Sequence, residues 1–324
     1  MARFPLLEHV DFAYLRLQAL TWSANRAYLP SCIQANAGKA LAALLDEAVT
    51  DRRCIVNAAG ISSVEDHALE AVRAALKGRR TEVIFLNARG IEHDLRTALG
   101  EPAVIMPHDG GVYVYGRDHR DHQASVKGWI EKAASLEMDE LTSRVADCFV
   151  KHPEPKRMAS TPVLATGVFD ARSLIKERGS FVSASLLLAD ALSRWIEEGK
   201  PGAFRLLAVS LRSSPLAAAL SLLCVSDEGV EIADHFGPKH KILEEYSLRP
   251  ESFRGEYVFV GDFIIGGTEM KIASAYARSK GSRLTHALAV GSLLNAKDYG
   301  VPFNISSLVN LQRACPEASF TFPG

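Results

Sequence analysis

The segment YVFVGDFIIGGTEMK, residues 257–271, places one carboxylate and two glycines after a short apolar run. The run is apolar on both faces, which is typical of a central strand in a parallel sheet. We therefore expect Asp262 where this strand ends at the carboxyl edge of the sheet, the edge at which open α/β sheets bind ligands. Gly266 and Gly267 let the backbone turn inward without a Cβ, and Thr268 precedes a predicted helix whose N-terminal amides suit an anion. The pattern predicts a pocket for a phosphate monoester, with Asp262 on a sugar hydroxyl.

Two plainer interpretations stay open for the same residues. Asp262 could be a helix-capping or turn aspartate, although a carboxylate at the end of a buried strand needs a partner. Gly266 and Gly267 could form only a tight turn between strand and helix.

A second segment, SLRSSPLAAAL at residues 210–220, also runs from a predicted strand into a helix. Proline is favoured at the first helical position because it has no N–H to leave unpaired. Arg212 would lie beside the free amides of this helix, an arrangement that suits an anion. The alternative is that Arg212 is a solvated surface residue.

A polar segment, residues 106–123, contains several residues that could in principle bind a metal, namely Asp118, His119, Asp121 and His122. A metal site needs ligands that converge in space, which consecutive residues on a loop rarely do. We therefore predict no metal site here. Gly110 and Gly111, followed by VYVYG, predict a turn and an edge strand instead.

The composition is that of a globular protein with two domains. A prior of about 150 residues per domain suggests two domains for 324 residues. The 37 basic and 38 acidic residues nearly cancel, so no net field would draw the chain onto nucleic acid or an acidic membrane. The N-terminus makes a poor signal peptide and no apolar run reaches the ~18 residues of a membrane span, so we expect a cytoplasmic protein. The five cysteines contain no Cys-x-x-Cys pair and are expected to be reduced.

The first half alternates helical and strand patterns, which predicts a small parallel sheet covered by helices. The predicted elements are a helix at 38–49, a strand at 53–61, a helix at 64–78, a strand at 81–90 and a helix at 92–100. A further helix at about 126–150 is followed by a polar, proline-bearing segment, 151–162, that predicts a linker. We expect an α/β protein with domains at residues 1–152 and 153–324.

The segment GISSVEDHALEAV, residues 60–72, resembles the STAS domain of anti-sigma-factor antagonists and transporter tails. The positions in step with that family's pattern are Gly60, Ile61, Val64, Glu65 and Leu69. The resemblance covers about residues 38–100 and implies a small STAS-like α/β module that binds a protein partner. Asp66 and His67 stand where regulatory members have serines, so we expect no phosphorylation switch there.

The second half resembles a type I phosphoribosyltransferase, nearest to orotate phosphoribosyltransferase, from Thr166 to Phe320. Five segments carry the resemblance in chain order: FDARSLI, VSLRSSPLAAAL, GPKHKI, VFVGDFIIGGTEM and GVPFNISSLVNLQ. In this family, magnesium-bound phosphoribosyl pyrophosphate loses pyrophosphate while a ring nitrogen of a base attacks the anomeric carbon through an oxocarbenium-like state. The resemblance implies a parallel-sheet fold, magnesium with the pyrophosphate substrate, and a homo-oligomer.

The resemblance also implies roles for residues of this chain. The ribose and its 5′-phosphate would be bound by Asp262, Gly266, Gly267 and Thr268. The pyrophosphate would be met by Arg212, Ser213 and Ser214, and covered by Lys239, His240 and Lys241. The catalytic residues among them would be Asp262, Lys239 and Lys241.

Three departures from the family pattern leave two classes of function. Gly261 replaces the first of the family's two acids, the loop is one residue short, and the Ser-Pro-Tyr element of orotate enzymes is missing before Phe169. We expect an enzyme that transfers or cleaves a phosphoribosyl group with an acceptor other than orotate. The alternative is a catalytically inactive sensor or regulatory subunit that binds phosphoribosyl pyrophosphate or a nucleotide, for which a bacterial defence system is one setting.

Overall fold

The computed structural model describes residues 6–17, 32–48, 53–76, 82–106, 110–116, 123–158, 163–199, 202–223, 228–233, 253, 255–294 and 296–321. The chain forms two compact units, Met1–Glu137 and Met138–Gly324. The sequence predicted a boundary between residues 152 and 153. That position lies inside a strand of the second unit, β9 (Phe149–Arg157). None of the helices in the described ranges combines the length and apolarity needed to cross a membrane.

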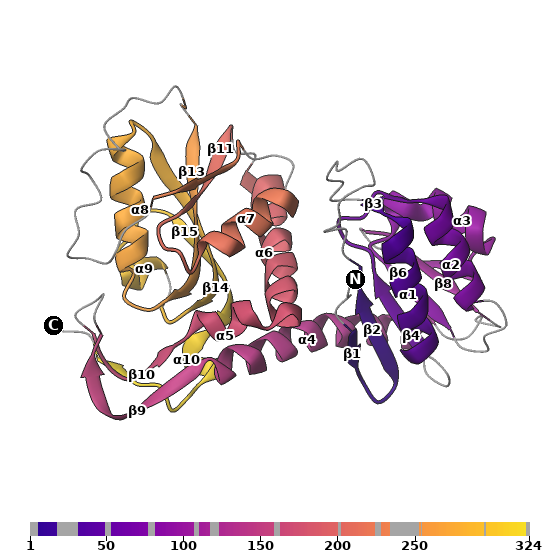
Figure 1. The fold of residues 1–324 in the computed structure, drawn as a ribbon, viewed down its shortest axis with the longest axis horizontal. Coiled ribbons are helices and arrows are strands. Elements are labelled where there is room, and N and C mark those ends of the chain that lie inside the picture. Colours follow the sequence, from indigo (N-terminus) through magenta and orange to yellow (C-terminus); the bar gives the residue numbers. More distant parts are fainter. Residues whose placement is uncertain are drawn as a thin grey trace. The chain divides into compact units, whose positions relative to one another are not determined.

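The first unit contains a six-stranded mixed sheet (Figure 1). In spatial order its strands are β1 (Leu6–Glu8), β2 (Phe12–Arg16), β4 (Arg53–Asn57), β6 (Val83–Leu86), β8 (Val112–Tyr115) and β7 (Val104–Met106). A two-stranded sheet adds β3 (Cys32–Ile33) and β5 (Ser63–Val64). The helical segments are α1 (Ala35–Ala48), α2 (Asp66–Leu76), the 3-10 turn η1 (Arg89–Ile91), α3 (Glu92–Leu99) and α4 (Gln123–Asp147).

The small parallel sheet predicted for this unit is confirmed for its centre and wrong at its sides. Strands β2, β4 and β6 are parallel, but β1 and β8 pair antiparallel to their neighbours. Residues 112–116 are not an edge strand, because β7 pairs with β8 on its outer side. Apolar residues of α1, α2 and α3 pack on one face of the sheet, and those of α4 pack on the other.

A buried polar network joins the sheet of the first unit to α4. Arg16 and Glu137 are 2% and 4% exposed, and their Nη1 and Oε2 atoms lie 3.2 Å apart. The Tyr14 hydroxyl donates to Glu137 and accepts from the Asn57 amide. The Asn87 amide in turn donates to Asn57, so the network follows the ends of three adjacent parallel strands.

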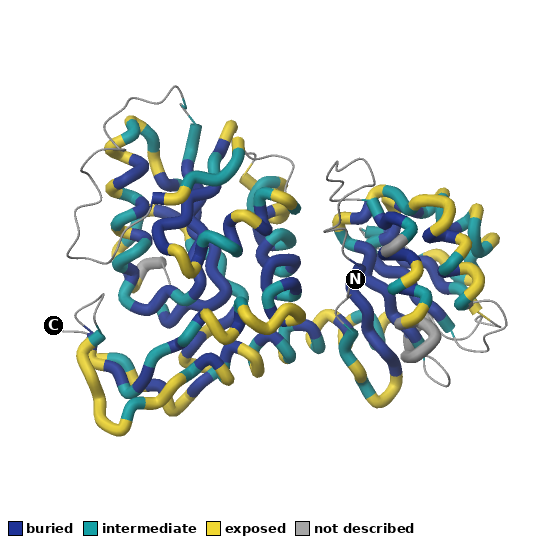
Figure 2. Tube along the Cα trace, in the orientation of Figure 1, coloured by how far each residue is buried: buried dark blue, intermediate teal, exposed yellow. Residues whose placement is uncertain are grey.

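The second unit is built on a five-stranded parallel sheet. In spatial order its strands are β12 (Val230–Ile232), β11 (Phe204–Ala208), β13 (Glu256–Ile264), β14 (Arg283–Ser292) and β15 (Asn304–Asn310). Helices α6 (Arg178–Gly199) and α7 (Ser214–Leu223) cover one face, and α8 (Thr268–Ser279) covers the other (Figure 1). The central strands are buried along most of their length (Figure 2), as expected for strands covered by helices on both sides. The short helices α5 (Ala171–Lys176), α9 (Ala296–Tyr299) and α10 (Leu311–Ala314) complete the unit.

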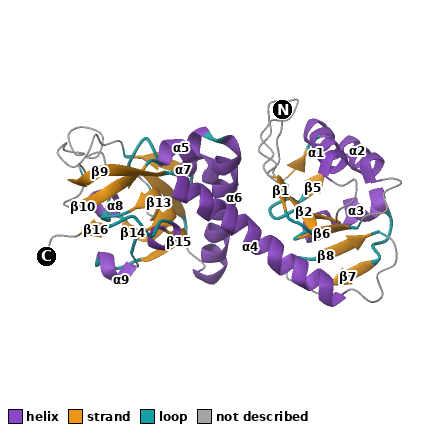
Figure 3. Cartoon of the chain, turned by 90° about the horizontal axis from the view of Figure 1, so that it is seen from below, coloured by secondary structure: helices purple, strands orange, loops and turns teal. Residues whose placement is uncertain are grey.

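The predicted linker at 151–162 is largely a strand. Strand β9 pairs antiparallel with β10 (Leu164–Phe169), which pairs on its other side with β16 (Phe320–Thr321) (Figure 3). The β9 sequence is polar because the strand lies at an exposed edge, where its two prolines are tolerated. The Phe169 ring lies 5.4 Å from the Phe263 ring, so this small sheet packs on β13.

Strand β13 is longer than the sequence predicted. Pairing with β14 continues from Glu256 to Ile264, so Asp262 lies within the strand and not after its end. Pairing with β11 stops at Phe259, which leaves the last residues of β13 hydrogen-bonded on one side only. Asp262 therefore lies where the sheet opens at its carboxyl edge.

A buried histidine should make the second unit acid-sensitive. Burial lowers the pKa of His286 to about 4, and its ring stacks on Trp195 at 5.1 Å. In the unfolded chain His286 binds a proton below a pKa of about 6.5, but in the folded unit only below about 4. The free energy of unfolding should therefore fall by about 3 kcal/mol as the pH falls from 7 to below 4. Unfolding followed by Trp195 fluorescence should show this loss in wild type, and a smaller one in His286→Gln. Parallel pH profiles for the two proteins would contradict the assignment.

Candidate functional site

A pocket of about 630 Å³ opens at the carboxyl edge of the parallel sheet in the second unit. Three connections of that sheet and its neighbour line it: the turn after β10, the turn between β11 and α7, and the loop between β13 and α8. The volume is in the usual range for small-molecule sites, about 300–1,000 Å³. The edge is the one that open parallel sheets use for ligands.

The loop between β13 and α8 is held in place by contacts on both faces of the sheet. Ile264 packs with Tyr299 on the α8 side, and Ile265 packs with the core on the α6 side. The Ile264 carbonyl accepts hydrogen bonds from the Leu293 amide and the Tyr299 hydroxyl. The two isoleucines thus line the pocket and anchor the loop without filling the cavity.

The loop glycines bring the backbone to the pocket. Gly267 has φ +71°, in the left-handed region that favours glycine, and a Cβ there would lie 2.9 Å from a ring carbon of Tyr299. Gly267 precedes α8, and no side chain caps this helix. The Lys271 amide makes the first bond of the helix, to the Gly267 carbonyl, so the amides of Thr268, Glu269 and Met270 have no partner within the helix.

Asp262 is 7% exposed and belongs to the pocket lining. Its Oδ1 accepts the Phe263 amide at 2.7 Å. Burial raises the pKa of the Asp262 carboxyl, and Asp170 adds to the rise, whereas the Phe263 amide and Arg212 oppose it. An acid in this position is costly to ionise unless a ligand or cation meets it.

Glu269 supplies a second carboxyl group to the same pocket. It is the second residue of α8, in the first helical turn. Burial, and then the negative charge of Asp262, raise the pKa of Glu269 to about 7, while Arg212 opposes the rise. The two carboxyl groups and the Arg212 guanidinium therefore form one electrostatic cluster.

A third carboxylate in the lining is already neutralised. The two oxygens of Asp170 accept from Nε and Nη2 of Arg172, at 2.8 and 3.0 Å. These hydrogen bonds lower the pKa of Asp170. Asp170 also caps α5 by accepting the Arg172 amide.

One part of the pocket lining is an apolar wall. It consists of side chains from the β9–β10 sheet and its flanks, namely Val150, Met158, Val168 and Phe169. Rings or other flat apolar groups can pack against such a wall.

Five predicted site residues line this pocket, namely Arg212, Asp262, Gly266, Gly267 and Thr268. Gly261, which replaces one acid of the family pattern, also belongs to the lining. Ser213 and Ser214 do not belong to its lining. The Ser213 hydroxyl is buried and hydrogen-bonded to Ser210, and the Ser214 hydroxyl donates to the Leu211 carbonyl. Lys239, His240 and Lys241 lie outside the described residues, as do Asp118, His119, Asp121 and His122.

Sequence reasoning missed Glu269, Asp170 and Arg172. Glu269 could have been found from its place directly after Gly-Gly-Thr, because an acid there lies next to any anion that the start of the helix binds. Asp170 and Arg172 directly follow β10, a strand of the neighbouring three-stranded sheet, and charged residues after a predicted strand were the available signal for them.

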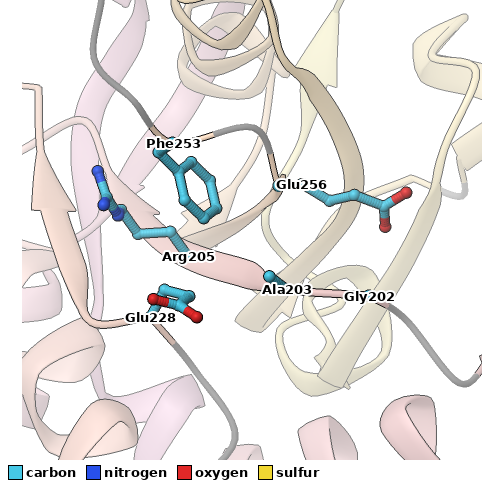
Figure 4. A pocket seen from close by; sticks show the side chains of 7 residues that line it. Gly202, Ala203, Arg205, Glu228, Phe253 and Glu256 are labelled. Atoms are coloured by element: carbon cyan, nitrogen blue, oxygen red, sulfur yellow. The ribbon is translucent and has the colours of Figure 1, made fainter.

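A second pocket, of about 560 Å³, lies at the opposite, amino edge of the sheet, where β11 and β13 begin (Figure 4). The Arg205 guanidinium lies over the Phe253 ring, 4.3 Å from its centroid, and pairs with Glu231. Glu256 points away from these two residues and pairs with Arg283. With its main charges already paired, this pocket is the weaker candidate.

Within the described part of the chain, no group of three or more His, Cys, Asp and Glu side chains could hold a metal ion.

No protein-family model matches the chain, and no curated protein matches it. Several solved structures are similar. Orotate phosphoribosyltransferase from Aeropyrum pernix is 16% identical, with 56% of this chain and 96% of that chain covered and a TM-score of 0.38. Adenine phosphoribosyltransferase from Trypanosoma brucei, in complex with AMP, pyrophosphate and ribose-5-phosphate, is 11% identical over 54% and 81%, with a TM-score of 0.39. UMP synthase from Leishmania donovani is 14% identical over 90% and 57%, with a TM-score of 0.40.

Because these TM-scores lie below 0.5, the residues of the pocket have to support any functional assignment. The resemblance of residues 38–100 to the STAS domain stays a prediction.

Proposed function

We propose that the second unit binds phosphoribosyl pyrophosphate or a nucleotide in the carboxyl-edge pocket and transfers or cleaves the phosphoribosyl group. The main support is a single pocket that contains the uncapped N-terminus of α8, the Arg212 guanidinium and the buried carboxyl of Asp262. These three groups would bind the 5′-phosphate, the pyrophosphate and the ribose of phosphoribosyl pyrophosphate, respectively.

The 5′-phosphate would lie at the N-terminus of α8. The free amides of the first turn and the helix dipole favour an anion there, and the Thr268 hydroxyl can donate one more hydrogen bond. Gly266 and Gly267 allow the phosphate to approach the backbone closely because no Cβ intervenes.

Asp262 would bind the ribose. Hydroxyl groups can donate to its carboxylate, which compensates the cost of its burial. An ionised carboxylate at this place would also stabilise positive charge on the sugar as its bond to the leaving group breaks.

Arg212 would meet the pyrophosphate or the remaining phosphate. Its guanidinium offers a planar set of donors that matches phosphate oxygens, and magnesium would enter bound to those oxygens. Lys239, His240 and Lys241 are proposed to cover the leaving group. The apolar wall near Phe169 suits a base or another flat acceptor.

The second candidate, an inactive sensor, is favoured by the surroundings of Gly261. A Cβ at this position would lie 2.8 Å from a ring carbon of Phe259, which is fully buried. A carboxylate at this position would require the Phe259 ring to shift. The β13 part of the pocket therefore has one acid, Asp262, where the family pattern has two. In that case the STAS-like first unit would bind a protein partner and signal to it whether the pocket holds its ligand. For either function we propose a cytoplasmic location.

The test is a titration with phosphoribosyl pyrophosphate and magnesium, followed by an assay of pyrophosphate release with a panel of bases. Asp262→Asn keeps the shape of the side chain and removes its charge, so we expect turnover to fall by at least about tenfold. Glu228→Gln, at the amino-edge pocket, is the matched control and should leave turnover unchanged.

Each result selects one outcome. Release with one base would support the enzyme. Binding without release for every base, lost in Arg212→Ala, would support the sensor. Absence of binding in wild type would refute both.

A further inference from the structure

We propose that Glu269 meets a phosphorylated ligand as a neutral carboxylic acid, so that binding of the ligand takes up a proton from solution wherever Glu269 is ionised beforehand. The inference rests on the proposed function, because it assumes that an anion binds at the N-terminus of α8. It assigns to Glu269 a role in ligand selection that the sequence pattern did not indicate.

The position of Glu269 creates a conflict that protonation resolves. The residue belongs to the first turn of α8, next to the amides that would bind a phosphate, and its side chain contributes to the pocket lining. An ionised carboxylate there would repel a phosphate across a poorly solvated gap. A protonated carboxyl would instead donate its O–H to a phosphate oxygen.

The other charged groups of the pocket lining come from β13, from the turn before α7 and from the segment after β10. Asp262 on β13 adds negative charge, and Arg212 in the turn before α7 adds positive charge. After β10, Asp170 is neutralised by Arg172 through two hydrogen bonds. One free guanidinium therefore faces two carboxyl groups within the described lining, which is too little to keep both ionised beside an anion.

The proton on Glu269 is available at physiological pH. With a pKa of about 7, the neutral and ionised forms of Glu269 are about equally populated near neutral pH, whereas an exposed glutamate is almost wholly ionised there. Approach of a phosphate adds negative charge and raises this pKa further. The free energy for protonation is therefore small near neutral pH and grows as pH rises.

The experiment measures the dissociation constant of ribose 5-phosphate for wild type and Glu269→Gln between pH 6.5 and 8.5. If only the neutral form binds, the wild-type constant should rise by about 25-fold over this range. Glutamine keeps a hydrogen-bond donor and cannot ionise, so its constant should stay nearly level and match that of wild type at low pH. Because the ligand also titrates, with a pKa near 6, the comparison is made between the two proteins at each pH.

Two further measurements complete the test. Calorimetry at pH 8.5 in buffers of different ionisation enthalpy should show uptake of about one proton for wild type and fewer for Glu269→Gln. Glu269→Ala, which lacks the donor, should bind more weakly than Glu269→Gln at every pH. Glu228→Gln at the amino-edge pocket should behave as wild type.

The possible failures are distinguishable. If wild type and Glu269→Gln bind with the same pH dependence, the role of Glu269 is refuted while the proposed ligand stands. Weaker binding by Glu269→Gln at high pH would show that the ionised carboxylate contacts the ligand, which also overturns the inference. If neither ribose 5-phosphate nor phosphoribosyl pyrophosphate binds wild type at any pH, the inference and the proposed function both fall.

Discussion

Gly267→Val should weaken binding of ribose 5-phosphate by at least about 100-fold while the rest of the second unit stays folded. Valine resists φ +71°, and its Cβ would lie 2.9 Å from the buried Tyr299 ring. The Tyr299 hydroxyl donates to the Ile264 carbonyl, so a shift of this ring would move the loop that forms one side of the pocket. Isothermal titration at fixed pH measures the effect.

Gly281→Val is the matched control for this prediction. Gly281 has nearly the same φ, +73°, but nothing lies within 4 Å of the position that its Cβ would take. Both variants should therefore lose stability from backbone strain, about 1–3 kcal/mol. Only Gly267→Val should lose the ligand. Equal binding by both variants would mean that the phosphate lies elsewhere than the start of α8.

The sequence predicted the part of this site that depends on local pattern. An apolar strand followed by Gly-Gly-Thr and a helix is a local arrangement, and α8 begins at Thr268 as that pattern requires. Residues 204–220 likewise form a strand, a turn and a helix, although α7 starts at Ser214, one residue before the proline. These features need only neighbours in the chain to form.

The features that sequence reasoning missed depend on partners distant in the chain. Asp262 lies inside a strand because β14 continues the ladder as far as Ile264. The polar segment 151–157 becomes a strand because β10 is available to pair with it. A pattern of alternating or apolar residues carries no signal for either event.

The electrostatics of the pocket depend even more on assembly. Glu269 looks in the sequence like any acid in the first turn of a helix, where it would be ionised and favourable. Its raised pKa follows from burial and from Asp262, which only the folded sheet brings near. The surroundings of Ser213 also depend on the fold, since its buried hydroxyl is hydrogen-bonded to Ser210.

In the first unit, removing one member of a buried ion pair should cost far more stability than removing one member of an exposed pair. Glu137→Ala removes the carboxylate that faces the buried Arg16 guanidinium and the Tyr14 hydroxyl. We expect the free energy of unfolding of the first unit to fall by about 3–5 kcal/mol, because a buried charge loses its counter-ion. Amide hydrogen exchange of β2 and β4 reports this unit separately from the second.

The exposed pair of Lys132 on α4 and Asp11, whose Nζ and Oδ2 atoms lie 3.3 Å apart in the same unit, provides the comparison. Lys132→Ala should cost only about 0–1 kcal/mol, because solvent screens that pair. Replacing both members of the buried pair by apolar residues, Arg16→Met with Glu137→Leu, should restore much of the stability lost in Glu137→Ala, since no buried charge then remains. If the double variant is as unstable as Glu137→Ala, the loss comes from packing around α4 and the electrostatic explanation is wrong.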